Sequence, residues 1–353
     1  MKLSILDQSP IISGHTPTDA VRETVKLAQT AERLGYHRYW LAEHHNMRGL
    51  ADPCPEILLG AVAAATSRIR VGTGGVLLPY YSALKVAEVF RMYEALYPGR
   101  IDLGIGRAPG GDMLTARAMN PRAFEDMDAF PRQVIELVGW LDEALPGDHP
   151  YHSVRAMPAG DTSPEIWLLG SSDYSGALAA HLGLRFAFAH FINAHGGDAV
   201  SRAYRAEFRA SLRDPAPYCM VCVFAICGET QAEAERLAAS IDHRRLLMAS
   251  GREALVATTD EALAYPYSER DREIIARERA RAVIGTPDAV KKRVLQIRDA
   301  FAADELMVIT ITGEYASRLR SYELLAQAFE LHAQASASAR ALSTDPARGE
   351  GAS

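Results

Sequence analysis

The chain alternates short apolar segments with longer amphipathic ones, and this alternation is the strongest constraint on its fold. Up to residue 106 the pattern of strand and helix repeats, with short loops between the segments. The predicted strands there are residues 2–7, 38–42, 68–73 and 101–106. Such an alternation is typical of parallel strands joined by crossover helices, so we expect an α/β fold with a parallel sheet.

The rest of the chain continues the pattern less regularly. Its predicted strands are residues 165–169, 185–189, 218–226 and 305–309, with helices between them. Residues from about 240 to 284 hold helical and polar stretches without a strand, which we interpret as an insertion in one late βα connection. Eight strands with intervening helices predict a (β/α)8 TIM barrel.

A change in composition marks the end of the predicted domain. From residue 335 to 353 Ser, Ala, Gly and Arg dominate, and aromatic residues are absent. Such a composition cannot bury enough apolar surface to fold, so we expect this tail to be disordered. The barrel domain then spans residues 1–334, with the insertion at about 240–284 inside it.

Net charge and residue usage exclude several classes of protein. The formal charge is -6 with both signs interspersed, which argues against nucleic-acid or membrane-surface binding. Residues 1–7 lack the pattern of a signal peptide, and no apolar run approaches the ~18 residues of a membrane span. The cysteines, 4 in a chain of 353 residues, form no disulfide framework. We therefore expect a soluble cytoplasmic protein.

Two adjacent histidines follow the second predicted strand. Glu43, His44 and His45 come where a parallel barrel keeps its catalytic groups, at the carboxyl end of a strand. Because side chains of a strand alternate between its faces, His44 and His45 should point to opposite sides. The bland alternative is a pair of loop histidines beside a charged residue. A zinc site is disfavoured, because adjacent histidines are poorly spaced for one metal and no second ligand cluster follows.

Glycine-rich turns follow the third and fourth predicted strands. Gly74 and Gly75 remove side chains where the backbone could approach a flat ligand, although a flexible turn would look the same. In residues 104–111 the spacing is not GxGxxG, and no acidic residue follows a second strand about 20 positions on, so we reject a dinucleotide site. Arg107 at this strand end is better interpreted as an anchor for an anion.

A third turn, Gly170-Ser171-Ser172-Asp173, joins a predicted strand to a predicted helix. Free backbone N–H groups and two hydroxyls at such a position suit a phosphate. Asp173 alone would repel a phosphate, so we expect it to cap the helix. A turn with a purely capping role is the alternative.

Taken together, these motifs resemble those of one family. The chain has YWLAEHHN at 39–46, RVGTGGVLLP at 70–79, YPGRIDLGIGRAPGGD at 97–112 and WLLGSSDYSGALAAHLGLRFAFAHF at 167–191. Each motif is weak alone, but their combination is similar to the bacterial-luciferase-like flavin-dependent monooxygenases, in particular to the alkanal-monooxygenase-like branch. The resemblance covers the chain except for its tail and is weakest at about 240–280.

The resemblance implies FMN, in its reduced form FMNH2, bound at the C-terminal face of the barrel. His44 matches the catalytic histidine of the family, with Glu43 and His45 beside it. Gly74 and Gly75 match the position of a non-proline cis peptide under the flavin ring. The residues that match or adjoin the phosphate site are Arg107, Arg122, Gly170, Ser171, Ser172 and Tyr174.

The implied reaction is a monooxygenation. FMNH2 would arrive from a separate NAD(P)H:flavin reductase, because the chain shows no nicotinamide site, and would react with O2 to a C4a-(hydro)peroxyflavin. That species would oxidise a small organic substrate, an aldehyde, a ketone or an aromatic compound. His44 would serve as acid or base, because an imidazole titrates near neutral pH. Gly106 and Gly170 stand where luciferase has a cysteine and an acidic residue, which argues against light emission.

Three other functions fit parts of the sequence. A deazaflavin (F420)-dependent dehydrogenase on the same fold would transfer hydride without consuming O2. A non-catalytic flavin-binding protein would keep only the cofactor site, and a metal-dependent barrel hydrolase would need zinc. The resemblance also suggests a homodimer, for which the second and third predicted helices, apolar and rich in alanine, offer an interface. The insertion could supply a lid over the site.

Overall fold

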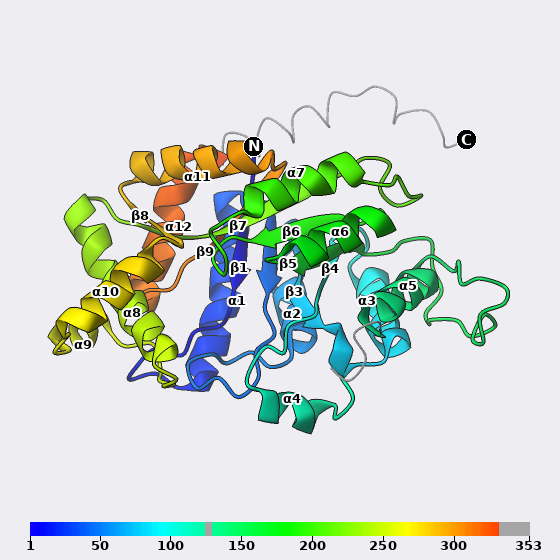
Figure 1. Ribbon diagram of the computed structural model, residues 1–353, viewed down its shortest axis with the longest axis horizontal. Coiled ribbons are helices and arrows are strands. Elements are labelled where there is room, and N and C mark those ends of the chain that lie inside the picture. Colours follow the sequence, from blue (N-terminus) through cyan, green and yellow to red (C-terminus); the bar gives the residue numbers. More distant parts are fainter. Residues whose placement is uncertain (124–128, 332–353) are drawn as a thin grey trace.

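Parallel pairing closes eight strands into a barrel, as the sequence predicts (Figure 1). The computed structural model describes residues 1–123 and 129–331. Neighbouring strands pair in the order β6-β5-β4-β3-β2-β1-β9-β7, and β7 pairs with β6 to close the ring. The barrel strands are β1 (Lys2–Asp7), β2 (Arg38–Leu41), β3 (Arg70–Leu77), β4 (Ile101–Gly106), β5 (Glu165–Gly170), β6 (Arg185–Ala189), β7 (Cys219–Cys227) and β9 (Glu305–Ile309).

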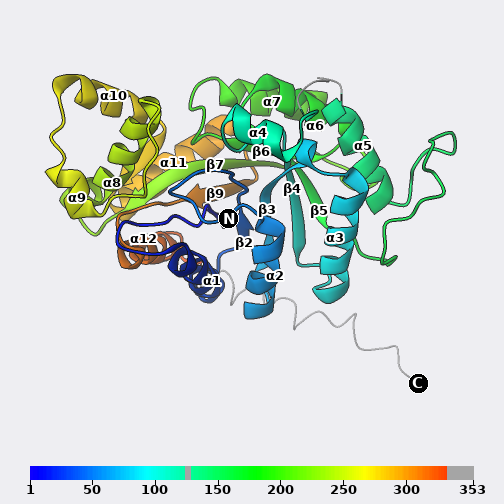
Figure 2. The same cartoon turned by 90° about the horizontal axis from the view of Figure 1, so that it is seen from below.

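Helices surround the barrel and supply the crossovers between consecutive strands (Figure 2). Among the described residues, none of them is long and apolar enough to span a membrane. The helices are α1 (Pro17–Leu34), α2 (Pro55–Ala65), η1 (Leu78–Tyr80), α3 (Ala83–Leu96), α4 (Met113–Met119), α5 (Ala129–Leu141), α6 (Asp173–Leu182), α7 (Gly197–Glu207), α8 (Gln231–Ala249), α9 (Thr259–Ala264), α10 (Glu269–Arg279), α11 (Pro287–Phe301) and α12 (Tyr315–Ala328).

Several elements differ from the sequence predictions. β3 does not stop at residue 73 but continues through the two glycines to Leu77. α4 follows the fourth strand where no element was predicted. An extra strand, β8 (Ala282–Gly285), lies inside the stretch predicted to have none, because four residues are too few for a recognisable period. Its partners are residues 224–227 of β7. The tail predicted to be disordered, 335–353, lies outside the described residues.

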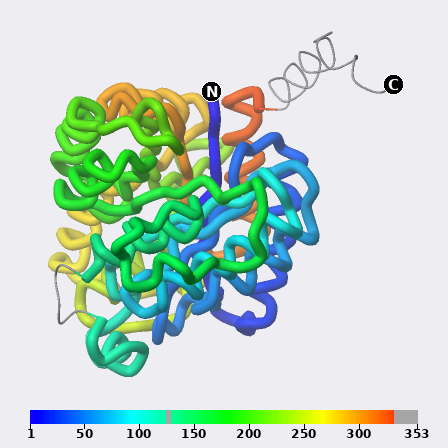
Figure 3. The backbone as a smooth tube through the Cα atoms, turned by 90° about the vertical axis from the view of Figure 1, so that its right-hand side faces the viewer, coloured from blue at the N-terminus to red at the C-terminus, as the bar shows by residue number. Residues whose placement is uncertain are grey.

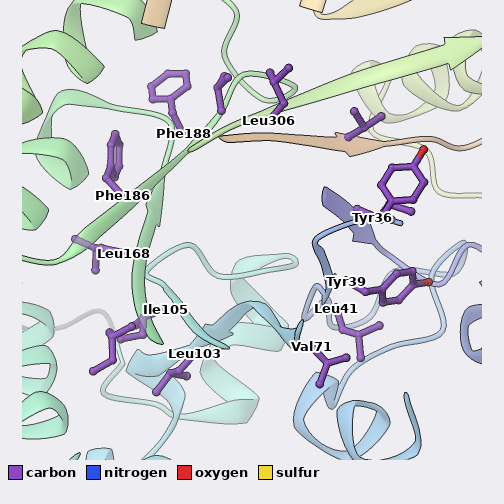
Figure 4. Packing of buried hydrophobic residues seen from close by; sticks show 14 of the residues in the cluster. Tyr36, Tyr39, Leu41, Val71, Leu103, Ile105, Leu168, Phe186, Phe188 and Leu306 are labelled. Carbon is purple, nitrogen blue, oxygen red and sulfur yellow. The ribbon is translucent and has the colours of Figure 1, made fainter. Parts of the chain in front are cut away.

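Side chains of the strands alternate between two cores. Tyr39 and Leu41 of β2 belong to the outer core between strands and helices, as does Phe186 of β6 (Figure 4). Trp40, between the first two, belongs instead to the core inside the barrel, where its ring lies 5.3 Å from that of Trp167. This period of two decides which side chains beyond the strand ends face the barrel axis.

Charged side chains close the amino-terminal end of the barrel. Arg38, the first residue of β2, is 1% exposed and lies 2.9 Å from Asp102, 2.7 Å from Glu165 and 3.0 Å from Glu305. Buried ion pairs of this kind add little net stability, but breaking one leaves a buried charge unpaired. The ion pairs of Arg38 therefore fix the strands relative to one another at the amino-terminal end of the barrel. The candidate active site lies at the carboxyl-terminal end.

The insertion between β7 and α11 forms its own layer. α8, α9 and α10 lie together at the left of the barrel in Figures 1 and 2, and β8 returns the chain to β7. The first and last barrel strands, β1 and β9, pair with each other, so the N-terminus lies beside the red C-terminal helices in Figure 3. α8 lies at the same barrel mouth as the loops after β1 and β2, since its residue Arg244 lines one cavity with Gln8 and His44.

Candidate active site

A cavity of about 300 Å³ opens at the carboxyl end of the barrel strands. Its walls come from loops and strand ends that are far apart in the sequence, which is the arrangement that TIM barrels use for their active sites. Of the predicted site residues, the lining includes Glu43, His44, Gly74, Gly75, Arg107, Gly170, Ser171, Ser172 and Tyr174. The predicted site residues that the lining does not include are His45 and Arg122.

His44 faces this cavity as a neutral imidazole. Its backbone N–H donates to the carbonyl of Asp52 at 3.1 Å, and its Nδ1 is buried without a hydrogen-bond partner among the described residues. Burial lowers the pKa of His44 to about 4, and the positive charge of Arg244 acts in the same direction. The expectation that this imidazole titrates near neutral pH is therefore wrong, because desolvation disfavours its charged form.

Glu43 and His45 bind each other, and His45, unlike Glu43 and His44, is not part of the cavity lining. Oε1 of Glu43 and Nε2 of His45 are 2.7 Å apart. The same carboxylate accepts hydrogen bonds from the Tyr81 hydroxyl at 2.7 Å and from the backbone N–H of Leu77 at 2.9 Å. These groups come from the loop after β2, from the last residue of β3 and from the segment that follows η1. Glu43 thus holds two neighbouring strand ends together.

The glycine pair at the end of β3 forms a wall without side chains. The Gly74–Gly75 peptide bond is cis, as the family resemblance implies. A Cβ at Gly75 would lie 2.6 Å from the carbonyl oxygen of Gly104, and one at Gly74 would lie 2.8 Å from Leu6 Cδ1. Neither distance leaves room for a methyl group. Close packing against the backbone of Gly104 explains Gly75, and close packing against the side chains of Leu6 and Trp40 explains Gly74.

A group of anion-binding donors forms another part of the lining. The Arg107 guanidinium lies 4.1 Å from the centre of the Tyr174 ring, which orients its N–H groups. Ser172 is the N-cap of α6, but its side chain makes no capping hydrogen bond within the described chain. The first N–H groups of α6 and the hydroxyls of Ser171 and Ser172 lie together there, and such a cluster suits a phosphate.

The prediction that Asp173 caps α6 is wrong. It is the first residue of α6, one position after the N-cap, and its carboxylate is exposed. It accepts a hydrogen bond from the N–H of Tyr174 at 2.8 Å. Ser172 takes the N-cap position because its backbone is extended, with φ of -141° and ψ of 167°.

Arg122 lies away from the described cavity. Its side chain is exposed, and its backbone N–H donates to the side chain of Asn120 at 3.1 Å. The neighbouring residues 124–128 lie outside the described part of the chain. The assignment of Arg122 to the phosphate site therefore stays a prediction.

The structure also brings in residues that the sequence interpretation missed. Tyr81 binds Glu43, Asp52 accepts from the backbone of His44, and Arg244 of α8 acts on the imidazole of His44. Burial raises the pKa of Asp52 to about 7. The adjacent Arg244 and Arg245 could have indicated a charged site in the sequence. They lie in a stretch that the sequence interpretation treated only as polar and helical. In residues 1–123 and 129–331 no group of side chains could hold a metal ion.

The shape and chemistry of the cavity fit a flat ligand with a phosphate tail. The glycine wall and the apolar lining, which includes Trp40 and Leu169, suit a planar ring system. Arg107 and the start of α6 suit the phosphate, and the buried hydroxyl of Tyr174 has no partner of its own among the described residues. The residues present thus fit FMN, a barrel-mouth ligand of that shape.

A closed parallel barrel with a cavity at the carboxyl ends of its strands is the architecture of the TIM-barrel enzymes. The chain belongs to the luciferase-like monooxygenase family, whose model matches residues 1–304. This membership places it among the oxidoreductases that act as oxygenases.

Similar proteins cover almost the whole chain. It is 39% identical to "Luciferase-like monooxygenase" of Escherichia coli (strain K12), over 91% of this chain and 95% of that protein. It is 37% identical to "N-acetyl-S-alkylcysteine monooxygenase" of Bacillus subtilis (strain 168), over 93% and 98%. The solved structure of apo-MsnO8 matches with a TM-score of 0.87 and 40% identity, over 94% and 98%.

Two more distant structures share the fold alone. One is a type II Baeyer-Villiger monooxygenase in complex with FMN, at 18% identity and a TM-score of 0.66. The other is an F420-dependent secondary alcohol dehydrogenase, at 11% identity and a TM-score of 0.68. The fold by itself therefore does not separate FMN from F420.

Proposed function

We propose that this protein is an FMN-dependent monooxygenase that takes reduced FMN from a separate NAD(P)H:flavin reductase. One observation carries the proposal: a single cavity joins an anion cradle (Arg107, Ser171, Ser172 and the start of α6), the glycine wall and His44, whose Nδ1 is buried and whose pKa is lowered. Bound reduced FMN would supply the electrons that activate O2. The family membership supports oxygenase chemistry over the hydride transfer of an F420-dependent dehydrogenase.

Each part of the cavity has a role in this proposal. Arg107 and the hydroxyls of Ser171 and Ser172 bind the flavin phosphate. The glycine wall lets the backbone approach the ring, and Glu43 fixes that wall by its bonds to the end of β3. His44 accepts or donates a hydrogen bond at Nδ1 and moves a proton of the reacting groups.

The substrate of the proposed reaction is a small organic molecule. Aldehydes, ketones and aromatic compounds are candidates from the family resemblance. The relative from Bacillus subtilis carries the name of an N-acetyl-S-alkylcysteine monooxygenase, which adds thioethers to the candidates. The apolar walls of the barrel mouth suit the hydrocarbon part of any of these.

Oxygen uptake tests the proposal directly. The protein is mixed with FMN, a flavin reductase and NADH, and O2 consumption is followed with a panel of these substrates. We expect substrate-dependent incorporation of labelled oxygen, and a loss of about 100-fold or more in turnover for His44→Ala with FMN binding retained. The exposed His152 provides the control His152→Ala.

Three results would contradict the proposal. Full turnover in His44→Ala would remove the role of His44. Tight FMN binding without oxygenation of any substrate would indicate a flavin-binding protein. Reduction of deazaflavin by an alcohol without O2 consumption would indicate the F420-dependent dehydrogenase.

We also propose that the protein acts as a homodimer through α2 and α3. Ile57 is 71% exposed, Met92 is 50% exposed and Leu96 is 59% exposed, and all three lie on these two helices. Exposed apolar side chains gathered on neighbouring elements are typical of an interface. Light scattering after size exclusion should give twice the mass of the chain, and Ile57→Glu should reduce it to the monomer mass.

A further inference from the structure

A second chamber adjoins the flavin cavity. It measures about 400 Å³ and shares Gln8, His44, Phe191 and Ile192 with that cavity. Its outer wall comes from α8 and the residues near the end of α10, which Figure 2 shows beside the barrel mouth. A molecule in this chamber would therefore reach His44 from the α8 side, and Arg107 is not part of the chamber lining.

Arg244 in the wall of this chamber is a buried charge without a partner. The residue is 8% exposed, yet its guanidinium forms no hydrogen bond or ion pair with any described residue. The charge of Glu253 acts on it, but this carboxylate forms no ion pair with it. The other buried arginines behave differently. Arg38 contacts three carboxylates, and Arg318 lies 2.6 Å from Asp7. Because an unpaired buried charge is costly, the exception at Arg244 indicates a missing anion.

The other charges of the chamber do not supply that anion. Among the described residues that line the chamber, the only carboxylate belongs to Glu278, which already pairs with Arg281. Glu253 lies outside this lining and accepts a hydrogen bond from the backbone N–H of Arg48 at 3.5 Å. Arg245 lies 4.6 Å from the centre of the Phe224 ring and donates to the Glu278 carbonyl oxygen at 3.1 Å. Three guanidinium groups thus face one carboxylate, and the chamber keeps an excess of positive charge.

The rest of the chamber is apolar. Its hydrophobic lining includes Phe191, Phe224, Ile241, Met248, Ile309 and Ile311. Such walls favour a hydrocarbon chain or ring, and the guanidinium favours a planar anion that it can bind with two N–H groups.

We propose that Arg244 binds the carboxylate of the organic substrate, and that the apolar part of this substrate fills the chamber as far as His44. This inference rests on the proposed function and specifies its substrate class as organic acids with an apolar chain or ring. Arg244 is the specificity-determining residue, because a neutral molecule of the same shape leaves its charge unpaired. The flavin phosphate does not compete for it, since Arg107 after β4 and the turn before α6 line the flavin cavity and not the chamber beside α8.

Binding of octanoate and octanamide to the FMN-loaded protein tests this. The two probes share a chain and differ in the charge of the head group. By titration calorimetry at pH 7.5 we expect octanoate to bind at least 10-fold more tightly than octanamide, which corresponds to about 1.4 kcal/mol. In Arg244→Gln the affinities for octanoate and octanamide should differ by no more than about 2-fold. Arg244→Lys should keep part of the preference for octanoate.

The control variant is Arg236→Gln. Arg236 lies on the same helix, but its side chain is 54% exposed and pairs with Asp260 at the surface. This variant should keep the full preference for octanoate. Equal binding of the two probes to the wild type would overturn the inference, and so would an unchanged preference in a folded Arg244→Gln protein.

The design separates this inference from the proposed function. Binding of the probes needs no turnover, so a protein that fails to oxygenate any substrate can still show the preference for octanoate. The comparison is repeated on the flavin-free protein. A failure to bind FMN would then contradict the proposed function alone, whereas loss of the octanoate preference would contradict the role of Arg244 alone.

Discussion

The carboxylate of Glu43 accepts a hydrogen bond from the backbone N–H of Leu77 at 2.9 Å, which ties the chain leaving β2 to the end of β3. Its other oxygen binds Tyr81 and His45. The glycine wall, Gly74 and Gly75, is separated from Leu77 by one residue of β3. The position of the wall therefore depends on the carboxylate of Glu43. We therefore propose that Glu43 positions the cavity wall, although the sequence placed it among the catalytic candidates.

Glu43→Gln should weaken both the fold and the flavin site. The amide keeps one acceptor oxygen but turns its N–H₂ toward groups that also donate, so at least one buried donor loses its partner. We expect the free energy of unfolding to fall by about 1–3 kcal/mol, and FMN affinity to fall with it. Urea denaturation and flavin fluorescence measure the two effects. Glu273→Gln at an exposed site of α10 is the control, and an equal result for both variants would contradict the positioning role.

Arg107→Ala should separate FMN from riboflavin, which lacks the phosphate. Loss of a charge-assisted hydrogen bond costs about 1.5–3 kcal/mol, so we expect FMN to bind about 10–100-fold more weakly, with little change for riboflavin. Fluorescence titration with both flavins measures this difference. Arg117→Ala, at an exposed position of α4, should change neither affinity. An equal loss for both flavins would show that Arg107 acts through the Tyr174 ring. Arg122→Ala in the same titrations tests whether Arg122 belongs to the cradle.

Gly75→Ala and Gly106→Ala should differ, although both glycines line the same cavity. A Cβ at Gly75 would meet the carbonyl oxygen of Gly104 at 2.6 Å, and backbone cannot move aside cheaply. A Cβ at Gly106 would meet only Leu77 Cδ2 at 3.2 Å, the end of a side chain that can rotate. We expect a loss of about 3 kcal/mol or more for Gly75→Ala and less than about 1 kcal/mol for Gly106→Ala, measured by urea denaturation. Equal losses would contradict this account of the glycine wall.

The barrel and the orientation of the two histidines were predictable from local patterns. A period of two that begins in β2 and continues beyond its end predicts that His44 and His45 point to opposite sides. The structure agrees, since His44 lines the cavity while His45 lies outside the lining and binds Glu43. The strand–helix alternation likewise predicted the closed barrel, because each repeat is a local pattern.

Contacts between distant segments were not predictable in the same way. Leu77 N–H and the Tyr81 hydroxyl reach Glu43 only because β2 and β3 are neighbours in the barrel and their loops fold toward each other. Arg244 looks like any charged residue of a polar helix until α8 is placed over the barrel mouth. The four residues of β8 form a strand only because the end of β7 offers them backbone partners.

The low pKa of His44 makes stability depend on pH in a defined direction. Its pKa is about 4 in the folded protein and 6.5 in an unfolded chain, mainly because burial disfavours the charge. Between these values the unfolded state binds the extra proton, so the wild type loses stability as pH falls from 6.5 to 4. The full effect is about 3 kcal/mol. Above pH 7 both states are neutral at this residue, and the effect disappears.

His44→Gln should remove this dependence. Other buried histidines, His37 and His190, also have lowered pKa values, so the informative quantity is the difference in unfolding free energy between wild type and variant at each pH. For the flavin-free protein we expect this difference to be constant from pH 7 to 8. At pH 5 the wild type should have lost about 1 kcal/mol or more of unfolding free energy relative to the variant. Urea denaturation at each pH measures it, with His152→Gln as the control for removing an exposed imidazole. A difference that stays constant down to pH 5 would show that His44 is protonated as easily in the folded protein as in water.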